Sequence, residues 1–349
     1  MTKTRTLCFF ERWMDPVGPE MLAANAKNVE VSGLSFADGP DHNWPLLAEA
    51  HGYQMLPAIE TADSFHPNAA FLERCPNLLA VASSGAGYDT FDVEACTKAG
   101  VLVFNQAGAN AESVAQHALG MMLALCKQMI QSDRAIRSED RDWDRWTYKG
   151  SELTGRTLGI VGLGNVGRRT SAICGPTFNM RVIASDPYIT EADFAERGAE
   201  KATLEQVMSE SDFVSVHCPL TDETRGMIGE KEFALMKPHA NFISTARGGI
   251  HDEAVLEKTL AEGRIAGAGL DVFEVEPPAM DHPLLAYPNT IVSPHNAGIT
   301  SDCTFNMARS SAEQWTALFK GERPRLLINP EAWELYTKRY EDILGEPVS

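Results

Sequence analysis

The sequence predicts an α/β fold with two domains, each built on a doubly wound parallel sheet, and with the second domain inserted into a split first domain. Its 349 residues are enough for two domains of about 100 to 200 residues each. Short apolar runs alternate with helical stretches, which is typical of parallel strands joined by helices. A glycine-rich turn between such a run and a helix occupies residues 157–167. We therefore expect residues 1–110 and 302–349 to form one domain and residues 111–301 the other.

The composition restricts the partners and the compartment. The chain carries 48 acidic and 30 basic residues, a net charge of −18, which argues against nucleic acid or an anionic membrane as a partner. The seven cysteines are scattered and show no C-x-x-C spacing, as expected for reduced thiols in the cytoplasm. Neither a signal-length apolar core nor an apolar run of membrane-spanning length is found. We expect a soluble, cytoplasmic protein.

The first region is expected to form a small parallel sheet. Its predicted strands are residues 6–10, 29–31, 55–59 and 78–82, and its predicted helices are 16–27 and 67–74. The last strand leads into residues 83–89, a turn of small residues whose backbone amides are able to face a ligand. An ordinary strand-to-helix loop is the alternative interpretation of this turn.

A long helix and a charged segment follow the first region. Apolar residues recur at helical spacing over residues 113–125, so this helix has one apolar face and is expected to connect the two domains. His117 on it is expected to be packed or hydrogen-bonded. The segment 132–150 is polar, but Trp143 and Trp146 lie within it. Tryptophans in such a segment indicate an oligomer interface.

The glycine-rich turn has the spacing G-x-G-x-x-G at Gly162, Gly164 and Gly167. In a Rossmann-like domain the first glycine makes the turn, the second lets the backbone approach a pyrophosphate, and the third packs the helix against the strand. The N–H groups at the start of the helix bind the phosphates. A second apolar run ends in Asp186, nineteen residues after Gly167, where a carboxylate accepts hydrogen bonds from both ribose hydroxyls. Because a carboxylate repels a 2′-phosphate and no arginine follows it closely, we predict NAD rather than NADP.

Strands and helices continue to alternate beyond Asp186. Strands are expected at residues 213–217, 240–244, 265–272 and 290–293, and helices at 231–236, 252–262 and 307–319, the last in a tail that returns to the first domain. Ligands of such sheets bind beyond the carboxyl ends of the strands, which here are residues 217–219, 245–249, 271–276 and 294–298. The candidate ligand contacts in these stretches are Cys218, Pro219, Thr245, Ala246, Asp271, His295, Ala297 and Gly298.

Hydride transfer beside a nicotinamide needs three groups from the protein. Arg247 suits the first role, a cation for the substrate's carboxylate and carbonyl, because its planar guanidinium binds a carboxylate in two places. His295 suits the second, an acid/base for the hydroxyl proton, because its charge changes near neutral pH. Glu276 or Glu274 suits the third, a carboxylate that stabilises the imidazolium. The alternative interpretations are a salt bridge for Arg247, a helix cap for His295 and a solvated loop acid for Glu276.

Motifs of other enzyme classes are missing from the sequence. The nine histidines show no H-E-x-x-H pattern, and no group of cysteines and histidines has the spacing of metal ligands. The serine motif G-x-S-x-G does not occur either. We therefore predict neither a metal site nor a serine nucleophile.

Five segments resemble the D-isomer-specific 2-hydroxyacid dehydrogenases. They read ELTGRTLGIVGLGNVG at residues 152–167, HCPLT at 217–221, STARGG at 244–249, AGLDVFEVEP at 268–277 and SPH at 293–295. The similarity extends over about residues 78–300. It implies an oxidoreductase that interconverts a small 2-oxo acid and its D-2-hydroxy acid with NAD(H), assembled as a homodimer through the NAD-binding domains.

The resemblance also implies a role for each functional residue. Arg247 binds and polarises the substrate, and His295 donates the proton during reduction. Glu276, rather than Glu274, orients His295, because the family's acid precedes a proline. Backbone amides that bind the substrate carboxylate belong to Ala86 and Gly87. Implied cofactor contacts are Asn165, Val166, Asp186, Cys218, Thr245 and, at the nicotinamide amide, Asp271.

The chain departs from the family pattern at two positions. Gln116 replaces a common glutamate in the connecting helix, and Asn296 replaces a common apolar residue after His295. Asn296 is therefore a candidate contact to the ligand or cofactor. Residues 51–55 are the candidate wall around the substrate's side chain, and the identity of the 2-hydroxy acid is open.

Several other functions share this scaffold. An NAD-sensing protein similar to the transcriptional corepressors and a phosphite dehydrogenase are alternatives. A 3-phosphoglycerate dehydrogenase is a third alternative; it requires additional cations, for which the first region offers Arg12 and Arg74. Formate oxidation is disfavoured, because formate dehydrogenases have a glutamine where this chain has Glu276.

Overall fold

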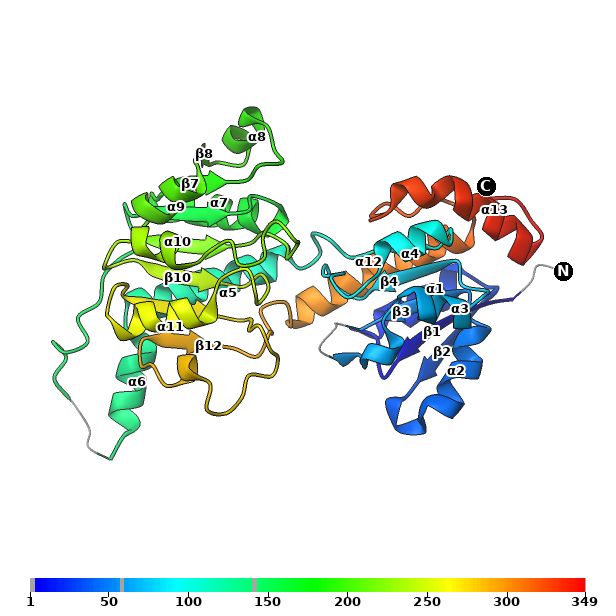
Figure 1. Ribbon diagram of the computed structural model, residues 1–349, viewed down its shortest axis with the longest axis horizontal. Coiled ribbons are helices and arrows are strands. Elements are labelled where there is room, and N and C mark those ends of the chain that lie inside the picture. Colours follow the sequence, from blue (N-terminus) through cyan, green and yellow to red (C-terminus); the bar gives the residue numbers. More distant parts are fainter. Residues whose placement is uncertain (1–3, 57–59, 140–142, 349) are drawn as a thin grey trace. The chain divides into compact units, whose positions relative to one another are not determined.

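The computed structural model describes residues 4–56, 60–139 and 143–348. The chain folds as two units, unit 1 formed by Met1–Asn110 and Ser301–Ser349, and unit 2 formed by Ala111–Thr300 (Figure 1). Each unit is an α/β structure around a parallel sheet, so the predicted fold class is confirmed. Over the described ranges, no helix is long and apolar enough to cross a membrane.

Unit 1 contains a five-stranded parallel sheet in the order β2-β1-β3-β4-β5. Its strands are β1 (Arg5–Phe10), β2 (Val29–Leu34), β3 (Gly52–Met55), β4 (Ala80–Ser83) and β5 (Leu102–Phe104). Its helices are α1 (Val17–Asn25), α2 (Pro40–Ala48), α3 (Ala69–Arg74), α4 (Val93–Lys98), α12 (Ser301–Phe319) and α13 (Trp333–Leu344). The strand predicted at residues 55–59 ends at Met55 instead, and residues 57–59 lie outside the described ranges.

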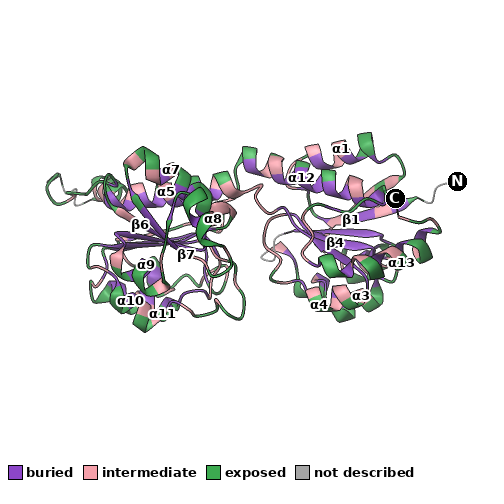
Figure 2. Cartoon of the chain, turned by 90° about the horizontal axis from the view of Figure 1, so that it is seen from above, coloured by how far each residue is buried: buried purple, intermediate pink, exposed green. Residues whose placement is uncertain are grey.

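Helices cover both faces of this sheet (Figure 2). On one face, Leu22 of α1 and Trp315 of α12 belong to a buried apolar cluster. On the other face, Leu47, Phe71 and Cys96 from α2, α3 and α4 form a second cluster. Because both faces are covered, all residues of β3, β4 and β5 are buried, and these strands show no alternation of polar and apolar residues.

The tail is more helical than the sequence predicts. Helix α12 begins at Ser301 rather than at residue 307, and α13 follows it as a helix that the sequence reading missed. Between the two helices, the side-chain carbonyl of Asn329 accepts a hydrogen bond of 2.7 Å from the backbone N–H of Val103 in β5. The tail therefore belongs to the structure of unit 1.

The prediction that residues 51–55 line the substrate site is wrong. β3 lies between β1 and β4, and Tyr53 within it is fully buried. The side-chain oxygen of Gln54 accepts hydrogen bonds from Ser311, at 2.7 Å, and from the indole of Trp315, at 2.6 Å. Gln54 therefore holds α12 on one face of the sheet, Tyr53 and Met55 pack in the apolar cluster on the other face, and these buried side chains do not face a ligand.

Unit 2 contains a seven-stranded parallel sheet in the order β12-β11-β10-β9-β6-β7-β8. Its strands are β6 (Thr157–Val161), β7 (Arg181–Ser185), β8 (Glu200–Lys201), β9 (Phe213–Val216), β10 (Asn241–Ser244), β11 (Gly267–Leu270) and β12 (Thr290–Val292). Its helices are α5 (Ala111–Cys126), α6 (Met129–Arg137), α7 (Asn165–Phe178), α8 (Glu191–Glu196), α9 (Leu204–Glu210), α10 (Glu230–Leu235) and α11 (Glu253–Ala261).

The strand order of unit 2 reverses at β6. The chain proceeds from β6 to β7 and β8 on one side, and then returns to build β9 to β12 on the other. Helices α5 and α7 cover one face of the sheet, and α9, α10 and α11 cover the other (Figure 2). In doubly wound sheets the crevice beyond the carboxyl ends at such a reversal is where dinucleotides bind.

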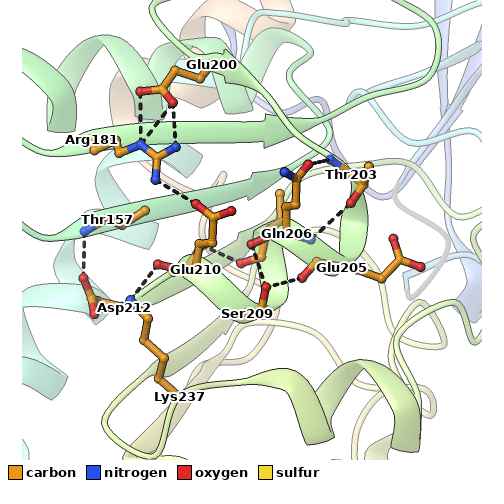
Figure 3. A network of polar contacts seen from close by, with 12 residues as sticks. Thr157, Arg181, Glu200, Thr203, Glu205, Gln206, Ser209, Glu210, Asp212 and Lys237 are labelled. Atoms are coloured by element: carbon orange, nitrogen blue, oxygen red, sulfur yellow. Dashed lines mark hydrogen bonds and ion pairs between the residues drawn. The ribbon is translucent and has the colours of Figure 1, made fainter.

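The opposite, amino-terminal edge of this sheet has a polar network of its own (Figure 3). The carboxylate of Asp212 accepts hydrogen bonds from the backbone N–H of Thr157, at 2.8 Å, and from Lys237, at 3.2 Å. Arg181, at the start of β7, binds Glu200 and Glu210. Burial raises the pKa of Asp212, but its hydrogen bonds outweigh this effect and hold the pKa below its usual value. This network joins the strand starts and lies at the edge remote from the strand ends.

Candidate active site

Three neighbouring strands end in the loops that carry the predicted catalytic residues. Arg247 follows β10, Glu276 follows β11 and His295 follows β12. Because β10, β11 and β12 are adjacent and parallel, their carboxyl ends lie at one edge of the sheet. Residues that are distant in the sequence are thereby brought together within unit 2.

His295 and Glu276 form a hydrogen-bonded pair. The ring nitrogen Nδ1 of His295 lies 2.8 Å from Oε2 of Glu276, and the other carboxylate oxygen accepts the backbone N–H of Phe273 at 3.0 Å. Both side chains are partly buried, with 27% of His295 and 17% of Glu276 exposed. Since Nδ1 is bonded to the carboxylate, Nε2 is the ring nitrogen that is able to exchange a proton with a substrate.

The surroundings of Glu276 favour its ionised form. Burial raises the pKa of this carboxyl group, but the hydrogen bond and the positive charge of His295 act in the opposite direction. The N–H of Phe273 and the charge of Arg247 lower the pKa further, so its net position is below the usual value. Arg247 is held in this region by a hydrogen bond of 2.8 Å from its guanidinium to the carbonyl of Ala246.

Asp271 shapes the turn that carries His295. It is 1% exposed, and its Oδ1 accepts hydrogen bonds from the hydroxyl of Ser293, at 2.6 Å, and from the N–H of Asn296, at 2.9 Å. Its Oδ2 accepts the N–H of Ala297 at 2.9 Å. These contacts support a backbone φ of 51° at His295, in the left-handed region that non-glycine residues rarely adopt.

Helix α5 supports the same turn from the other side. The hydroxyl of Ser113 donates to the carbonyl of Ala297 at 2.7 Å. Nε2 of His117 lies 3.0 Å from the hydroxyl of Ser293, so the expectation of a hydrogen-bonded His117 is confirmed. The sequence does not predict these contacts between α5 and the His295 turn, because no local pattern relates residues so distant in the chain.

The two departures from the family pattern lie in different environments. Gln116 donates a hydrogen bond of 2.7 Å to Glu112, and Glu112 forms an ion pair with Arg169 of α7, so these contacts join two helices. Asn296 is exposed, and its backbone N–H is bound by Asp271. Asn296 is thus next to His295 with an exposed side chain.

The glycine-rich turn leaves a space in front of helix α7. Gly162 has a φ of 90°, and a Cβ there would lie 2.6 Å from the backbone N of Cys218. A Cβ on Gly167 would lie 2.2 Å from the carbonyl oxygen of Gly162, so both positions exclude a side chain. A Cβ on Gly164 would meet no atom within 4 Å. Open space before the N–H groups that begin at Asn165 fits the pyrophosphate of a dinucleotide.

Asp186 lies directly after β7 and next to this turn. Its carboxylate accepts the N–H of Leu163 at 2.9 Å and the N–H of Tyr188 at 3.0 Å. A carboxylate has about four acceptor positions, so positions remain for the ribose hydroxyls. Arg197, eleven residues beyond Asp186, donates to the carbonyl of Leu163 at 2.8 Å. The arginine at the end of helix α8 thus contacts the glycine-rich turn, a contact that the sequence does not predict.

The remaining predicted cofactor residues surround the ends of the central strands. Thr245 and Ala246 follow β10 and are buried, and the hydroxyl of Thr245 lies 3.5 Å from Nδ1 of His217. Burial lowers the pKa of His217 to about 4, so its imidazole is neutral at pH 7. The other predicted cofactor residues, Asn165, Val166, Cys218, Pro219, Ala297 and Gly298, lie in the loops or helix starts that follow β6, β9 and β12.

The site offers no obvious thiolate. Burial raises the pKa of the Cys218 thiol to about 12, so it is uncharged at pH 7. Among the residues that the structure describes, no three histidine, cysteine, aspartate or glutamate side chains form a group able to hold a metal ion. The groups that the strand ends present are a guanidinium, carboxylates and an imidazole.

In unit 1, Ala86 and Gly87 lie in the loop after β4. The loop is fixed by a hydrogen bond of 2.7 Å from the side chain of Asn105 to the carbonyl of Ala86, and by one of 2.9 Å from Ser84 N–H to the carbonyl of Met55. Both residues are partly exposed. Within the described parts of the chain, no hydrogen bond uses the N–H of either one. Their binding of a substrate carboxylate stays a prediction.

Comparisons with known proteins show the family of the chain. The family model for the NAD-binding domain of D-isomer-specific 2-hydroxyacid dehydrogenases matches residues 119–297. A glyoxylate reductase from Aeropyrum pernix is 40% identical over 320 residues, which cover 90% of this chain and 94% of that protein. A D-3-phosphoglycerate dehydrogenase from Archaeoglobus fulgidus is 34% identical over 319 residues, covering 90% of this chain and 58% of that protein.

A solved structure is similar over both units. The crystal structure of D-lactate dehydrogenase from Aquifex aeolicus, complexed with NAD and lactic acid, is matched with a TM-score of 0.77 and 26% identity, covering 90% of this chain and 96% of that one. The fold, the glycine turn and these matches define an NAD-dependent oxidoreductase whose cofactor domain is unit 2. The chain belongs to the D-isomer-specific 2-hydroxyacid dehydrogenases.

Proposed function

We propose that this chain reduces a small 2-oxo acid to its D-2-hydroxy acid and catalyses the reverse oxidation. The observation that carries the proposal is the His295–Glu276 pair next to Arg247, at the strand ends of the cofactor domain. It supplies a cation, a proton donor and a carboxylate that stabilises the charged donor. NADH supplies the hydride when it is bound.

Each residue has a defined task in this proposal. Arg247 binds the substrate carboxylate and polarises the carbonyl through its planar guanidinium. His295 gives the proton on Nε2 to the carbonyl oxygen, and takes it back in the oxidation. Glu276 is ionised and holds Nδ1, which stabilises the imidazolium and fixes the orientation of the ring. The amides of Ala86 and Gly87 are proposed as further donors to the carboxylate.

The cofactor contacts are proposed from the fit of the residues. The N–H groups at the start of α7 bind the pyrophosphate, Asp186 binds the ribose hydroxyls, and Asp271 accepts from the nicotinamide amide. Oδ2 of Asp271 has one hydrogen bond, to Ala297, which leaves it an acceptor position. Further proposed contacts are Asn165, Val166, Cys218, Pro219, Thr245, Ala246, Ala297 and Gly298.

Within the reaction class, we propose a substrate that carries no charged group besides its carboxylate, such as glyoxylate. A phosphate group needs available cations, and the two that the sequence offers in unit 1 are already engaged. Arg12 forms an ion pair with Glu60 at 2.5 Å. The guanidinium of Arg74 lies over the ring of Trp44, 3.4 Å from its centroid. The 40% identical relative from Aeropyrum pernix is named a glyoxylate reductase, which supports the same choice.

We further propose a cytoplasmic homodimer. Trp143 and Trp146 of unit 2 are 76% and 68% exposed, and large exposed aromatic side chains are enriched at the centres of interfaces. The neighbouring residues 140–142 lie outside the described ranges. Light scattering on the purified chain should give twice its mass of 38.1 kDa. A monomer at micromolar concentration would contradict the homodimer.

The test of the function is NADH oxidation, followed by absorbance, with glyoxylate, hydroxypyruvate, pyruvate, phenylpyruvate and a phosphorylated 2-oxo acid. The His295→Ala variant should lose about 10³-fold in kcat, since a positioned proton donor contributes about 10²- to 10⁴-fold. Its affinity for NADH, measured by fluorescence, should change little. His42→Ala is the matched control, because His42 is exposed on α2 of unit 1.

Three results would contradict the proposal. Near-normal turnover of His295→Ala would remove His295 from the proton transfer. Tight NADH binding by the unmodified chain, without turnover of any 2-oxo acid, would favour an NAD-sensing function similar to that of the corepressors. Turnover of phosphite in place of 2-oxo acids would favour a phosphite dehydrogenase.

A further inference from the structure

A second histidine–carboxylate pair lies behind the Glu276 loop. Nε2 of His282 is 3.1 Å from Oε2 of Glu253, the first residue of α11. The other oxygen of Glu253 accepts the backbone N–H of Glu274 at 2.6 Å. Glu253 is 9% exposed, so this is a carboxylate with little solvent and with partners on both oxygens.

Glu253 is not needed to begin its helix. The N-cap of α11 is Asp252, whose side chain accepts the N–H of Val255 at 3.0 Å. The bonds of Glu253 are made instead to a loop more than twenty residues further along the chain. Burying a carboxylate costs stability unless it is paired, and the hydrogen bonds from Glu274 and His282 offset that cost. The partners of Glu253 therefore indicate that its role concerns the loop of Glu274 and His282.

The loop held in this way is the one that carries Glu276. Two successive backbone N–H groups of this loop donate to different carboxylates: Phe273 N–H donates to Glu276, and Glu274 N–H donates to Glu253. The ring of His282 packs edge-on against the ring of Phe273, with centroids 5.4 Å apart. The second pair thus contacts the loop that carries Glu276 at two points, the backbone of Glu274 and the ring of Phe273.

The peptide group between Phe273 and Glu274 also lies close to the loop of Arg247. A Cβ added to Gly248 would lie 2.0 Å from the carbonyl oxygen of Phe273 and 2.4 Å from the N of Glu274. Gly248 directly follows Arg247, so only a residue without a side chain lets the two loops approach this closely. A shift of the Phe273–Glu274 peptide would change the spacing of Arg247 and Glu276 together.

We propose that Glu253 and His282 are positioning residues that hold Glu276 in register with His295 and Arg247. The proposal rests on the proposed function for its effect on turnover, and on the geometry alone for its effect on the His295–Glu276 hydrogen bond. His282 acts through Glu253 and Phe273, and neither Glu253 nor His282 touches the reacting atoms. The site thereby consists of one histidine–carboxylate pair braced by another.

The test uses His282→Phe, which keeps the ring packing on Phe273 and removes the hydrogen bond to Glu253. His282→Gln restores a side-chain donor and is the rescue variant. His251→Phe is the matched control: His251 is 1% exposed and its ring contacts Phe242, at 5.1 Å between centroids. Neither of its ring nitrogens has a hydrogen-bond partner among the described residues.

Two readouts are measured on the full chain. In kinetics with NADH and glyoxylate, His282→Phe should lower kcat about tenfold, as expected for the loss of one buried hydrogen bond to a charged group, with little change in the Kd for NADH. In the pH profile of the reduction rate of His282→Phe, the decline at alkaline pH should begin at a lower pH than in the unmodified chain. His282→Gln should recover most of kcat, and His251→Phe should keep it.

The second readout is independent of turnover. In proton NMR, the Nδ1–H of His295 bonded to Glu276 should appear at low field and disappear in His295→Ala. In His282→Phe this resonance should shift upfield or broaden, and in His251→Phe it should stay. An unchanged resonance in His282→Phe, or a lower melting temperature with kcat and pH profile unchanged, would overturn the positioning role. If the unmodified chain turns over no 2-oxo acid but shows the His295 Nδ1–H resonance, and this resonance responds to His282→Phe, only the proposed function would be rejected.

Discussion

The two units share an architecture but differ in the polar groups that they bury or present at their strand ends. Unit 2 presents charged and titratable side chains, above all Arg247, Glu276 and His295. In unit 1 the corresponding loop after β4 presents backbone at Ala86 and Gly87. The comparison indicates that a parallel sheet determines where a site lies, at the carboxyl ends of its strands. The residues in the loops determine whether that site is suited to catalysis or to binding.

The buried polar networks of the units differ in the same way. Unit 1 joins helix α12 of its tail to the loop after β5 through neutral amides, for example Gln314, whose side chain donates to Gln106 at 3.0 Å, and its partly buried ion pair between Arg5 and Glu346 lies further along the tail. Unit 2 supports its site with ionisable groups, such as Asp271 beneath the His295 turn. Neutral amides do not titrate near pH 7, so we expect pH to act on the reaction mainly through unit 2.

The largest effect is expected for the cation of unit 2. Arg247→Ala should lower kcat/KM for glyoxylate about 10³-fold, because two charge-assisted hydrogen bonds to the substrate are lost together. Arg247→Lys should recover only part of the loss, since an ammonium cannot form the paired contact. The comparison of units would fail if Arg247→Ala kept normal kcat/KM, because recognition of the carboxylate would then lie elsewhere.

A smaller effect is expected for Glu276→Gln. Losing one charge-assisted hydrogen bond of about 2 kcal/mol should lower kcat about 30-fold. A neutral amide stabilises the imidazolium less, so the rate of reduction should begin to fall at a lower pH than in the unmodified chain. An identical alkaline limb in both proteins would show that the Glu276 charge does not act on His295.

Glu276→Gln also has an expected effect on stability. Because the pKa of Glu276 is lowered in the folded chain, its ionised form stabilises the fold at neutral pH, and this contribution is lost as the pH falls through the lowered pKa. The difference in melting temperature between Glu276→Gln and the unmodified chain should therefore shrink on acidification. A difference that grows at acid pH would contradict the direction of the pKa shift.

The smallest effect is expected in unit 1. Glu60→Gln removes the ion-pair partner of Arg12 and should raise kcat/KM for a phosphorylated 2-oxo acid up to about fivefold, since exposed ion pairs contribute about 0.2–1 kcal/mol. Turnover of glyoxylate should stay within twofold. Equal gains for both substrates would argue against a selective role of this pair, and Arg12→Ala in the same background should cancel the gain.

The sequence by itself determined the fold class and the cofactor. The glycine spacing and Asp186 are local patterns. Each has a physical requirement that a single residue type meets: a turn without side chains, and a hydrogen-bond acceptor after the second strand. The same holds for Arg247, Glu276 and His295, which follow predicted strands, and the structure places Glu276, rather than Glu274, on His295. Their catalytic roles stay a proposal.

The tertiary structure alone decided which groups meet across long sequence distances. It buried residues 51–55 in the sheet, paired Arg12 with Glu60, returned Arg197 to the glycine turn and joined Glu253 to His282. Local periodicity cannot report such contacts, because hydrogen bonds and ion pairs act over a few ångströms and depend on loop ends that only the packed sheet brings together. The sequence thus specified the reacting groups, and the packing specified what holds them.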